Sequence, residues 1–229
     1  MRAVVLARWA LGILIGAMVL LLPLVHYRAT YEHSRRLRLV TDRDVELPDG
    51  RMVHHTVYRS GQLTAAGFRD AIRRYQIRTV VNLQEEARDP LIPTGVFRKP
   101  TVRQSDVLND LHVNYVALDG GVLDHPDAPG VAGGRPLVID QFLELVDKPE
   151  NHPILFHCKA GLHRTGLIAA IYRMEYDRRP ITAAVEELKA NGFGTFAATD
   201  GNVYLERFIY QFRPGQRRTP AKATAEGGR

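Results

Sequence analysis

The chain has 229 residues, 45% of them hydrophobic, and a formal net charge of +6 at pH 7. This hydrophobic content supports a packed core and excludes an intrinsically disordered chain, while the basic balance favours anionic partners. The single cysteine excludes an internal disulfide and a zinc site built from several thiolates, and the scattered arginines accompany no recognition motif, so we expect no nucleic-acid binding.

An apolar stretch follows a short basic tail, residues 1–8. Residues 9–25 read WALGILIGAMVLLLPLV and carry no charge over 17 residues. This length is at the short end of a membrane span, and the stretch lacks the polar face of a surface helix. No small-x-small cleavage site follows. We predict an uncleaved transmembrane anchor, with a cleaved signal peptide as the alternative.

The flanking charges leave the membrane orientation open. Two arginines precede the apolar stretch and four follow it: Arg2 and Arg8, then Arg28, Arg35, Arg36 and Arg38. The positive-inside rule counts arginines near both ends, so the two flanks nearly cancel. The prediction is a single-pass membrane protein whose larger part faces either side.

The remaining chain divides into a linker, a domain and a tail. Residues 26–52 are polar and rich in arginine, which indicates a juxtamembrane linker. Residues 53–213 form the predicted domain. Residues 214–229 are rich in Gly, Pro, Thr, Ala and Arg, which predicts a disordered tail.

Strands and helices alternate in the predicted domain. The β-branched or apolar runs 78–83, 113–118 and 153–158 predict strands. Thr64 caps one helix, and further helices are predicted at 136–146, 165–177, 181–192 and 202–212. This alternation predicts an α/β fold with a central, mostly parallel sheet flanked by helices.

Two features near the start of this domain have open or ordinary interpretations. The neighbours His54 and His55 rarely ligate one ion and no third ligand is indicated, so we expect surface residues and no metal site. Arg59, in YRSGQ, either faces the substrate or pairs with a carboxylate.

The only cysteine lies in HCKAGLHRTG, residues 157–166, between an apolar strand and an apolar helix. Ligands of α/β sheets bind at this kind of position, outside the carboxyl end of a strand. The backbone N–H groups that can converge there on an anion belong to Lys159, Ala160, Gly161, Leu162 and His163. The helix N-terminus adds positive charge, and Arg164 supplies a planar fork for two phosphate oxygens. The pattern predicts a site for a tetrahedral oxyanion.

The same positive field acts on the thiol. A cysteine near a helix N-terminus and cationic groups loses its proton readily, so Cys158 is expected to attack a bound phosphorus as a thiolate and form a phosphocysteine. Thr165 is placed to donate a hydrogen bond to the sulfur. Gly161 permits a backbone conformation that a side chain would obstruct. A lone cysteine is ordinarily an apolar core residue, but the surrounding pattern favours a nucleophile.

HCKAGLHRTG resembles the signature loop of the cysteine-dependent protein tyrosine and dual-specificity phosphatases, and it is particularly similar to the tensin-type and atypical dual-specificity branches. VYRSGQL (57–63) and TVVNL (79–83) resemble the opening strands of small bacterial and plant members. The resemblance covers about residues 57–212. It implies a phosphomonoesterase without metal or other cofactor. Cys158 would be the nucleophile and Arg164 the phosphate binder, with His157 tuning the cysteine.

Phosphate ester hydrolysis also needs a carboxylic acid that protonates the leaving oxygen and then activates water. The family takes it from a mobile loop after the strand that precedes the signature. Here Asp119, in LDGG, follows that strand directly, and Gly120 and Gly121 can act as hinges. This DGG resembles the cyclin-dependent-kinase-associated phosphatases. We predict Asp119 as the general acid and Asp124 as the alternative, since the segment departs from the Trp-Pro-Asp form.

The sequence therefore predicts a membrane-anchored phosphomonoester hydrolase of the dual-specificity or tyrosine phosphatase type. The alternatives are a phosphate-binding module without turnover and a rhodanese-type sulfurtransferase. Cys158 and Arg164 together disfavour the first, and the Arg-Thr-Gly ending with an upstream aspartate disfavours the second. A phosphotyrosine, phosphoserine or phosphothreonine protein and a phosphoinositide or inositol phosphate both fit as substrate. The exposed charge of Lys159 is compatible with a multiply charged one.

Overall fold

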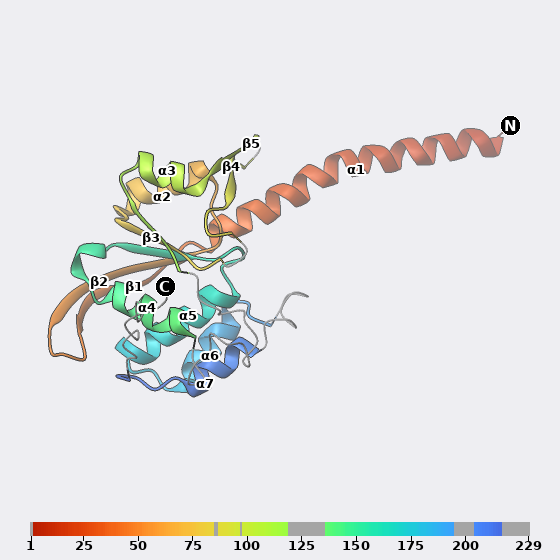
Figure 1. Cartoon of the computed structure of the whole chain (residues 1–229). Helices are drawn as coiled ribbons and strands as arrows, with labels where there is room; N and C mark the ends of the chain where they lie inside the picture. Colours follow the sequence, from red (N-terminus) through yellow and green to blue (C-terminus); the bar gives the residue numbers. More distant parts are fainter. Residues whose placement is uncertain (1, 85–86, 97, 119–135, 195–203, 217–229) are drawn as a thin grey trace, which may run out of the picture.

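A computed structural model describes residues 2–84, 87–96, 98–118, 136–194 and 204–216. Figure 1 shows a sheet covered by helices on both faces, from which a long N-terminal helix projects. The predicted acid Asp119, its alternative Asp124 and most of the predicted disordered tail lie outside the described residues.

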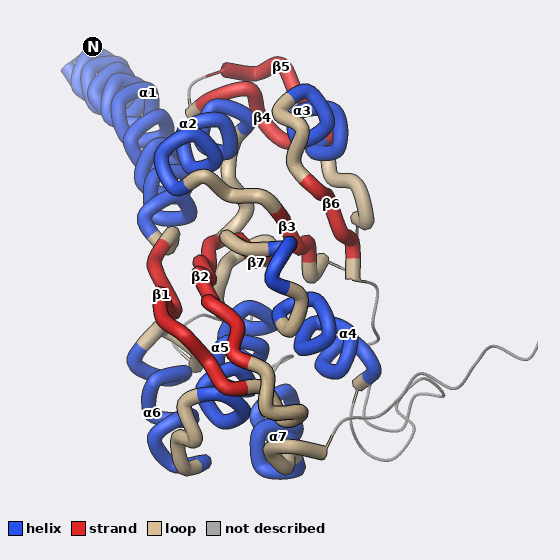
Figure 2. The backbone as a smooth tube through the Cα atoms, turned by 90° about the vertical axis from the view of Figure 1, so that its left-hand side faces the viewer, coloured by secondary structure: helices blue, strands red, loops and turns tan. Residues whose placement is uncertain are grey.

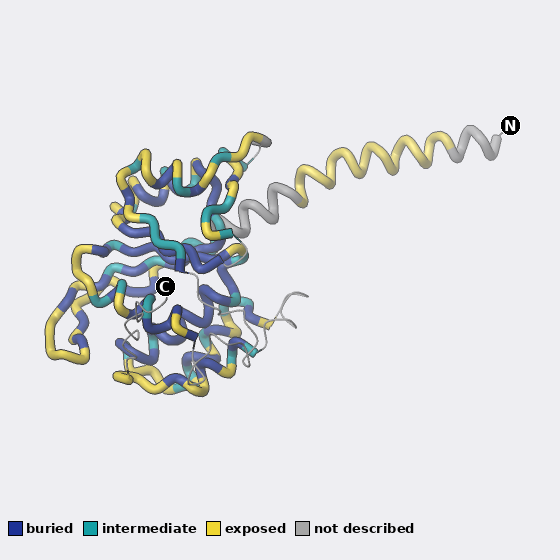
Figure 3. The backbone as a smooth tube through the Cα atoms, viewed as in Figure 1, coloured by how far each residue is buried: buried dark blue, intermediate teal, exposed yellow. Residues whose placement is uncertain are grey.

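The helix α1 (Arg2–Arg35) contains the predicted anchor. Its stretch Arg8–Val25 has a mean hydropathy of 2.1, and none of it is buried. Figure 3 shows it exposed along this length. By length and composition it is able to cross a membrane. The helix continues to Arg35, so the apolar stretch is joined to the domain by helix rather than by an extended chain.

The central sheet has five strands in the order β1-β2-β7-β3-β6. Four of them run parallel to one another: β2 (Met52–Ser60), β7 (Ile154–His157), β3 (Thr79–Asn82) and β6 (Asn114–Ala117). The fifth, β1 (Arg38–Glu46), runs antiparallel to β2 at the edge of the sheet. The predicted α/β fold with a mostly parallel sheet is confirmed.

The predicted linker over residues 26–52 is wrong. The helix α1 occupies its first part, and β1 pairs with β2 from Arg38 to Glu46. Val40 and Val45 of β1 are buried in the core. An edge strand has one solvated side and carries charged residues, so its composition is that of a polar linker. The domain begins at about residue 38 instead of 53.

The helices form one layer on each face of the sheet (Figure 2). On one face lie α2 (Ala65–Tyr75) and α3 (Gln104–Asp110). On the other lie α4 (Leu137–Val146), α5 (His163–Tyr176), α6 (Ile181–Ala190) and α7 (Tyr204–Gln211). A 3-10 turn, η2 (Pro149–Asn151), precedes β7, and β4 (Leu91–Gly95) with β5 (Arg98–Arg103) forms a separate hairpin. The predicted helices are all present, and Thr64 caps α2 through its side chain, which accepts from Gly67 N at 3.1 Å.

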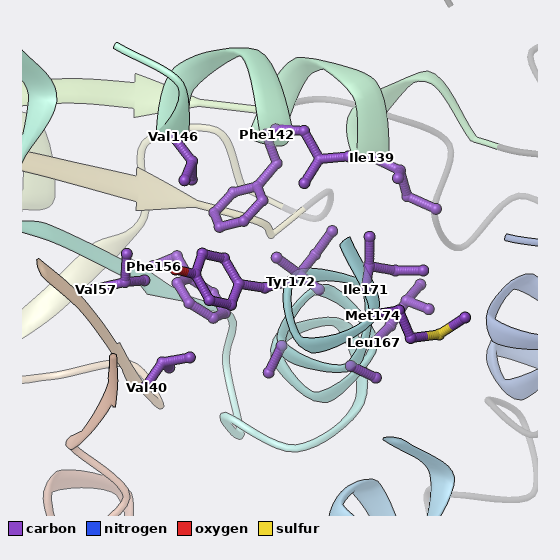
Figure 4. Close-up of a cluster of buried hydrophobic side chains, with 14 of the residues drawn as sticks. Val40, Val57, Ile139, Phe142, Val146, Phe156, Leu167, Ile171, Tyr172 and Met174 are labelled. Carbon is purple, nitrogen blue, oxygen red and sulfur yellow. The ribbon is translucent and has the colours of Figure 1, made fainter. Parts of the chain in front are cut away.

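Alternation along the strands divides the core in two. Leu155 of β7 packs with α2 and α3, whereas its neighbours Ile154 and Phe156 pack with α4 and α5. This follows because successive side chains of a strand point to opposite faces. Figure 4 shows the larger cluster, in which Phe142 and Phe156 meet edge to face with centroids 5.0 Å apart. Both layers together fix β7, which leads into the signature loop.

The same alternation corrects one expectation for β2. His54 is exposed as predicted, but His55 is fully buried and its ring stacks on His152 with centroids 4.7 Å apart. Two adjacent strand residues necessarily face opposite sides of the sheet. The prediction of two surface histidines is therefore wrong for His55.

Candidate active site

The carboxyl ends of the parallel strands meet at one edge of the sheet. Ser60 of β2 and Asn82 of β3 both pair with His157 of β7, and Ala117 of β6 pairs with Asn82. The signature stretch leaves the sheet at this level and enters α5 at His163. The edge is the candidate active site, as expected for an α/β sheet.

Three consecutive carbonyl groups of the signature loop are bonded to donors outside it. Gln62 N donates to Lys159 O at 2.9 Å. The guanidinium of Arg36 donates to Ala160 O at 2.6 Å, and that of Arg59 donates to Gly161 O at 3.0 Å. These bonds turn the carbonyl side of the loop toward the body of the domain.

The N–H groups of the same peptides therefore point the other way. In a planar trans peptide the C=O and the following N–H are antiparallel. The N–H of Gly161 confirms this direction, since it donates to Cys158 Sγ at 3.3 Å. Those of Ala160 and Leu162, the other two peptides, make no hydrogen bond to any described residue. The loop thus turns a row of N–H donors toward the side on which the sulfur lies, an arrangement suited to an anion.

Gly161 is required for this conformation. It has φ +70°, and a Cβ there would lie 2.5 Å from Gly61 N and 2.8 Å from Gly61 Cα. A side chain would meet backbone atoms that have no room to move, in a conformation that L-residues rarely adopt. The predicted role of Gly161 is confirmed.

The cysteine and the arginine of the signature are both buried. Cys158 is 4% exposed and Arg164 is 5% exposed. Arg164 is the second residue of α5, and its guanidinium donates to Leu83 O, just beyond β3, at 3.1 Å. This bond places the Arg164 guanidinium at the carboxyl end of β3. The helix N-terminus and the guanidinium thus add positive charge beside the cradle.

Two loop residues form the outer part of the site. Lys159 is exposed, and His163 is half-buried and lies edge to face with Phe193, with centroids 5.6 Å apart. Burial lowers the pKa of His163, and the positive charges of Arg164 and Arg36 lower it further. A neutral His163 leaves the positive charge of the loop to Lys159 and Arg164.

Four buried polar atoms at this edge have no hydrogen-bond partner among the described residues. They are Arg59 Nε, Ser60 Oγ, His157 Nδ1 and Thr165 Oγ1. Each buried unsatisfied group costs about 1–3 kcal/mol, and native structures keep few of them. Thr165 Oγ1 therefore makes no bond to the sulfur here, although it is buried one residue from Arg164. The gathering of such atoms around one loop indicates groups reserved for a ligand or for a reacting thiol.

Arg59 does not pair with a described carboxylate, so this one of its two predicted roles is wrong. It is 3% exposed, makes no ion pair within the described part of the chain, and donates a hydrogen bond to the signature loop at Gly161 O. Burial lowers its pKa to about 10, the charge of Arg38 acts in the same direction, and Cys158 and Glu187 oppose it. Arg59 is thus cationic at neutral pH and supports the loop next to the cysteine.

A row of three glutamine side chains, the amide relay, runs along the same edge and ends on His157. Gln84 Nε2 donates to Gln62 Oε1. Gln62 Nε2 donates to Gln104 Oε1 at 2.9 Å, and Gln104 Nε2 lies 2.9 Å from His157 Nε2. Burial lowers the pKa of His157 to about 4, an effect that the Cys158 backbone partly opposes. The imidazole is therefore neutral at physiological pH.

These glutamines were accessible to sequence reasoning only in part. Gln62 and Gln84 each stand two residues after a strand end, Ser60 and Asn82, which is where ligand-facing polar residues of parallel sheets occur. Gln104 carries no such signal, because it starts α3, 53 residues before His157.

The structure brings together the predicted residues 157–165, whereas the predicted acids Asp119 and Asp124 lie outside the described residues. Leu118 N donates to Asn82 O at 2.9 Å. The described chain therefore reaches the carboxyl edge at the residue that precedes Asp119.

Residues 38–203 match the family model described as "DSP-PTPase phosphatase fused to NAD+ Kinase". The chain belongs to this phosphatase family. The match begins at the first residue of β1, in agreement with the corrected domain start, and it confirms the resemblance drawn from the signature loop.

Individual relatives of the chain align over shorter parts. The dual specificity protein phosphatase TpbA of Pseudomonas aeruginosa strain UCBPP-PA14 is 40% identical over 57 residues, 25% of this chain and 26% of that protein. The inositol diphosphatase DSP3 of Arabidopsis thaliana is 26% identical over 157 residues, 69% of this chain and 68% of that protein. The crystal structure of P. aeruginosa TpbA has a TM-score of 0.47 at 24% identity, covering 66% of this chain and 78% of that one. The alignment with TpbA thus spans about a quarter of that relative's length.

Proposed function

We propose that this protein is a phosphomonoester hydrolase of the dual-specificity or tyrosine phosphatase type, working through a phosphocysteine. The observation that carries the proposal is the signature loop itself. Three of its carbonyl groups are bonded outward, and the N–H of Gly161 donates to Cys158 Sγ on the opposite side. An arrangement of this kind binds three phosphoryl oxygens while the fourth, the ester oxygen, points away from the sulfur.

In the first step the thiolate of Cys158 attacks phosphorus in line with the ester oxygen. A P–S bond forms as the P–O bond breaks, and the leaving oxygen takes a proton from a carboxylic acid. Arg164 and the N–H cradle stabilise the charge on the equatorial oxygens. Thr165, with its unpartnered buried hydroxyl, donates to the sulfur when it is a thiolate.

In the second step water attacks the phosphocysteine. The carboxylate left by the first step takes the proton of this water, inorganic phosphate leaves, and the Cys158 thiolate and the acid are regenerated. We assign the acid to Asp119, with Asp124 as the alternative. The backbone bond of Leu118 to the carboxyl edge supports Asp119, because it brings the chain to the site one residue earlier.

We also propose that α1 anchors the protein as a single membrane span of either orientation. The apolar stretch Arg8–Val25 supports this role. The helix then runs to Arg35, ten residues beyond Val25 or about 15 Å at 1.5 Å per residue. Since Arg36 bonds the signature loop, the site stands close to the domain end of that helix.

The substrate is a phosphorylated group exposed enough to enter this cradle. A phosphotyrosine, phosphoserine or phosphothreonine protein fits, as does an inositol phosphate or a phosphoinositide. TpbA is named as a dual specificity protein phosphatase and DSP3 as an inositol diphosphatase, so relatives with both kinds of name exist. The family match favours phosphate over the sulfur-transfer alternative.

The test is turnover of p-nitrophenyl phosphate by the full chain in detergent, with a chelator present throughout. We expect chelator-resistant hydrolysis, reduced on the order of 100-fold by Asp119→Asn and within twofold of wild type for Asp124→Asn. The reverse pattern assigns the acid to Asp124. A folded wild type that binds vanadate or phosphate without any turnover contradicts the proposal and identifies a binding module.

A further inference from the structure

The amide relay gives each of its side chains one orientation. An isolated carboxamide can turn by 180° and exchange its oxygen and nitrogen. Gln104 is prevented from doing so because Gln62 Nε2 donates to its oxygen at 2.9 Å. Gln62 is held in turn because its nitrogen also donates to the backbone oxygen of Leu63 at 3.3 Å, while its own oxygen accepts from Gln84 Nε2. Gln104 therefore presents its N–H, and not its oxygen, to His157.

This N–H selects one tautomer of the ring. Gln104 Nε2 lies 2.9 Å from His157 Nε2, and both residues are fully buried. A neutral imidazole has one nitrogen that donates and one that accepts. Because the amide donates to Nε2, the ring proton has to be on Nδ1.

Nδ1 is the ring nitrogen that Gln104 does not contact. It is buried and makes no full hydrogen bond in the described part of the chain, while a backbone acceptor of Cys158 lies near enough to the ring to raise the pKa of His157. An unpartnered N–H donor in this position favours negative charge on Cys158, whereas an unpartnered lone pair would disfavour it. The direction of the relay thus determines the sign of the ring's effect.

We propose that Gln104, oriented by Gln62 and Gln84, is a positioning residue that fixes neutral His157 in the Nδ1–H tautomer and so raises the reactivity of Cys158. This role rests on the proposed phosphatase chemistry for its purpose. The test of this role is independent of that chemistry, because the tautomer of His157 and the reactivity of the thiol are both measured without substrate.

The first measurement is the rate at which iodoacetamide alkylates the protein at pH 6. Cys158 is the only cysteine of the chain, so the signal has a single source. We expect Gln104→Met to slow alkylation about fivefold and Gln62→Met about twofold, as loss of one hydrogen bond implies. Gln211→Met is the matched control, because Gln211 is exposed at the end of α7, and it should leave the rate unchanged.

The second measurement is the ¹⁵N spectrum of the histidine rings in the full chain in detergent, with His157 assigned through its loss in His157→Gln. Wild type should show a neutral ring protonated on Nδ1. Gln104→Glu has nearly the same shape but offers an acceptor to Nε2, so the proton should move to Nε2. This variant keeps the proposal testable where Gln104→Met does not fold.

Wild-type His157 protonated on Nε2 would overturn the proposal. So would an Nδ1–H ring that persists in Gln104→Glu, or a folded Gln104→Met that is alkylated at the wild-type rate. The expected tautomer and alkylation rates in a protein without phosphatase turnover would retain the positioning role and remove the proposed function. Turnover with the wrong tautomer would do the opposite.

Discussion

The two ends of β7 carry two buried histidines with different surroundings. His152 precedes the strand, and its ring atoms bond the backbone. Nδ1 lies 3.2 Å from both the N and the O of Thr56, and Nε2 lies 2.7 Å from Val146 O. His157 ends the strand and lies against a side-chain amide through Nε2, and its Nδ1 makes no full hydrogen bond to the described residues.

The difference teaches which end of the strand is built for chemistry. Backbone partners are fixed by the fold, so His152 serves to join β7, β2 and the end of α4. Where the partner is a side chain, a buried polar group can be left without a hydrogen bond, which lowers the stability of the fold. His157 stands among such unused groups next to Cys158. One strand therefore has a structural end and a reactive end, and substitutions should separate them.

The largest expected effect is on turnover at the reactive end. Cys158→Ser should reduce the hydrolysis of p-nitrophenyl phosphate by at least about 1,000-fold, because the serine hydroxyl is a far poorer nucleophile in this field. The melting temperature should stay within about 2 °C, since one sulfur is replaced by one oxygen. Residual turnover above a few per cent of wild type would remove Cys158 from the mechanism.

The next effect is on stability in acid. The folded pKa of His157 is lowered by burial to about 4, below its ordinary 6.5. As pH falls below 6.5 the unfolded chain takes up a proton that the folded chain refuses, so stability decreases between pH 6.5 and about 4, by up to about 3 kcal/mol. Urea unfolding of wild type and His157→Gln across this pH window measures the contribution of His157 to this loss of stability. Equal slopes in the two proteins would show that His157 does not contribute it.

A comparable effect is expected from the loop glycine. Gly161→Ala should lower kcat/KM on the order of 100-fold, because the new Cβ meets Gly61 N at 2.5 Å and displaces the N–H cradle. Gly50→Ala is the matched control. Gly50 also has positive φ, +85°, but nothing lies within 4 Å of its Cβ position. It should lose only stability, and equal kinetic losses in both variants would contradict the role of the close contact.

The smallest effect belongs to the structural end of the strand. His152→Phe keeps a ring that stacks on His55 but removes the bonds to Thr56 and Val146. Unfolding in urea should show a loss of about 1–3 kcal/mol, while kcat for p-nitrophenyl phosphate stays within about twofold. A kinetic defect as large as that of the loop variants would mean that the two ends are not separable.

The sequence predicted what is encoded locally. The signature loop, the strands β3, β6 and β7 and the helices α4 to α7 each follow from runs of apolar residues and their capping or breaking residues. The anion cradle follows from the type of residue at each position of one short loop, so it too was predictable.

The remainder depends on contacts between distant parts of the chain. β1 is a polar edge strand whose identity comes only from its pairing with β2. The bond from Arg36 to the loop spans 124 residues, and that from Arg59 spans 102. The amide relay joins residues from three separate segments. No local pattern distinguishes Arg36, Arg59 or Gln104 from ordinary surface arginines and glutamines.

The measurement that tests the central claim most directly is the mass of the peptide that contains Cys158 after rapid acid quench during turnover. The account predicts that this peptide gains one phosphoryl group, that the gain is absent in Cys158→Ser, and that Asp119→Asn accumulates it if water attack becomes slow. Steady hydrolysis by the full chain with an unmodified Cys158 peptide at every quench time would contradict the account.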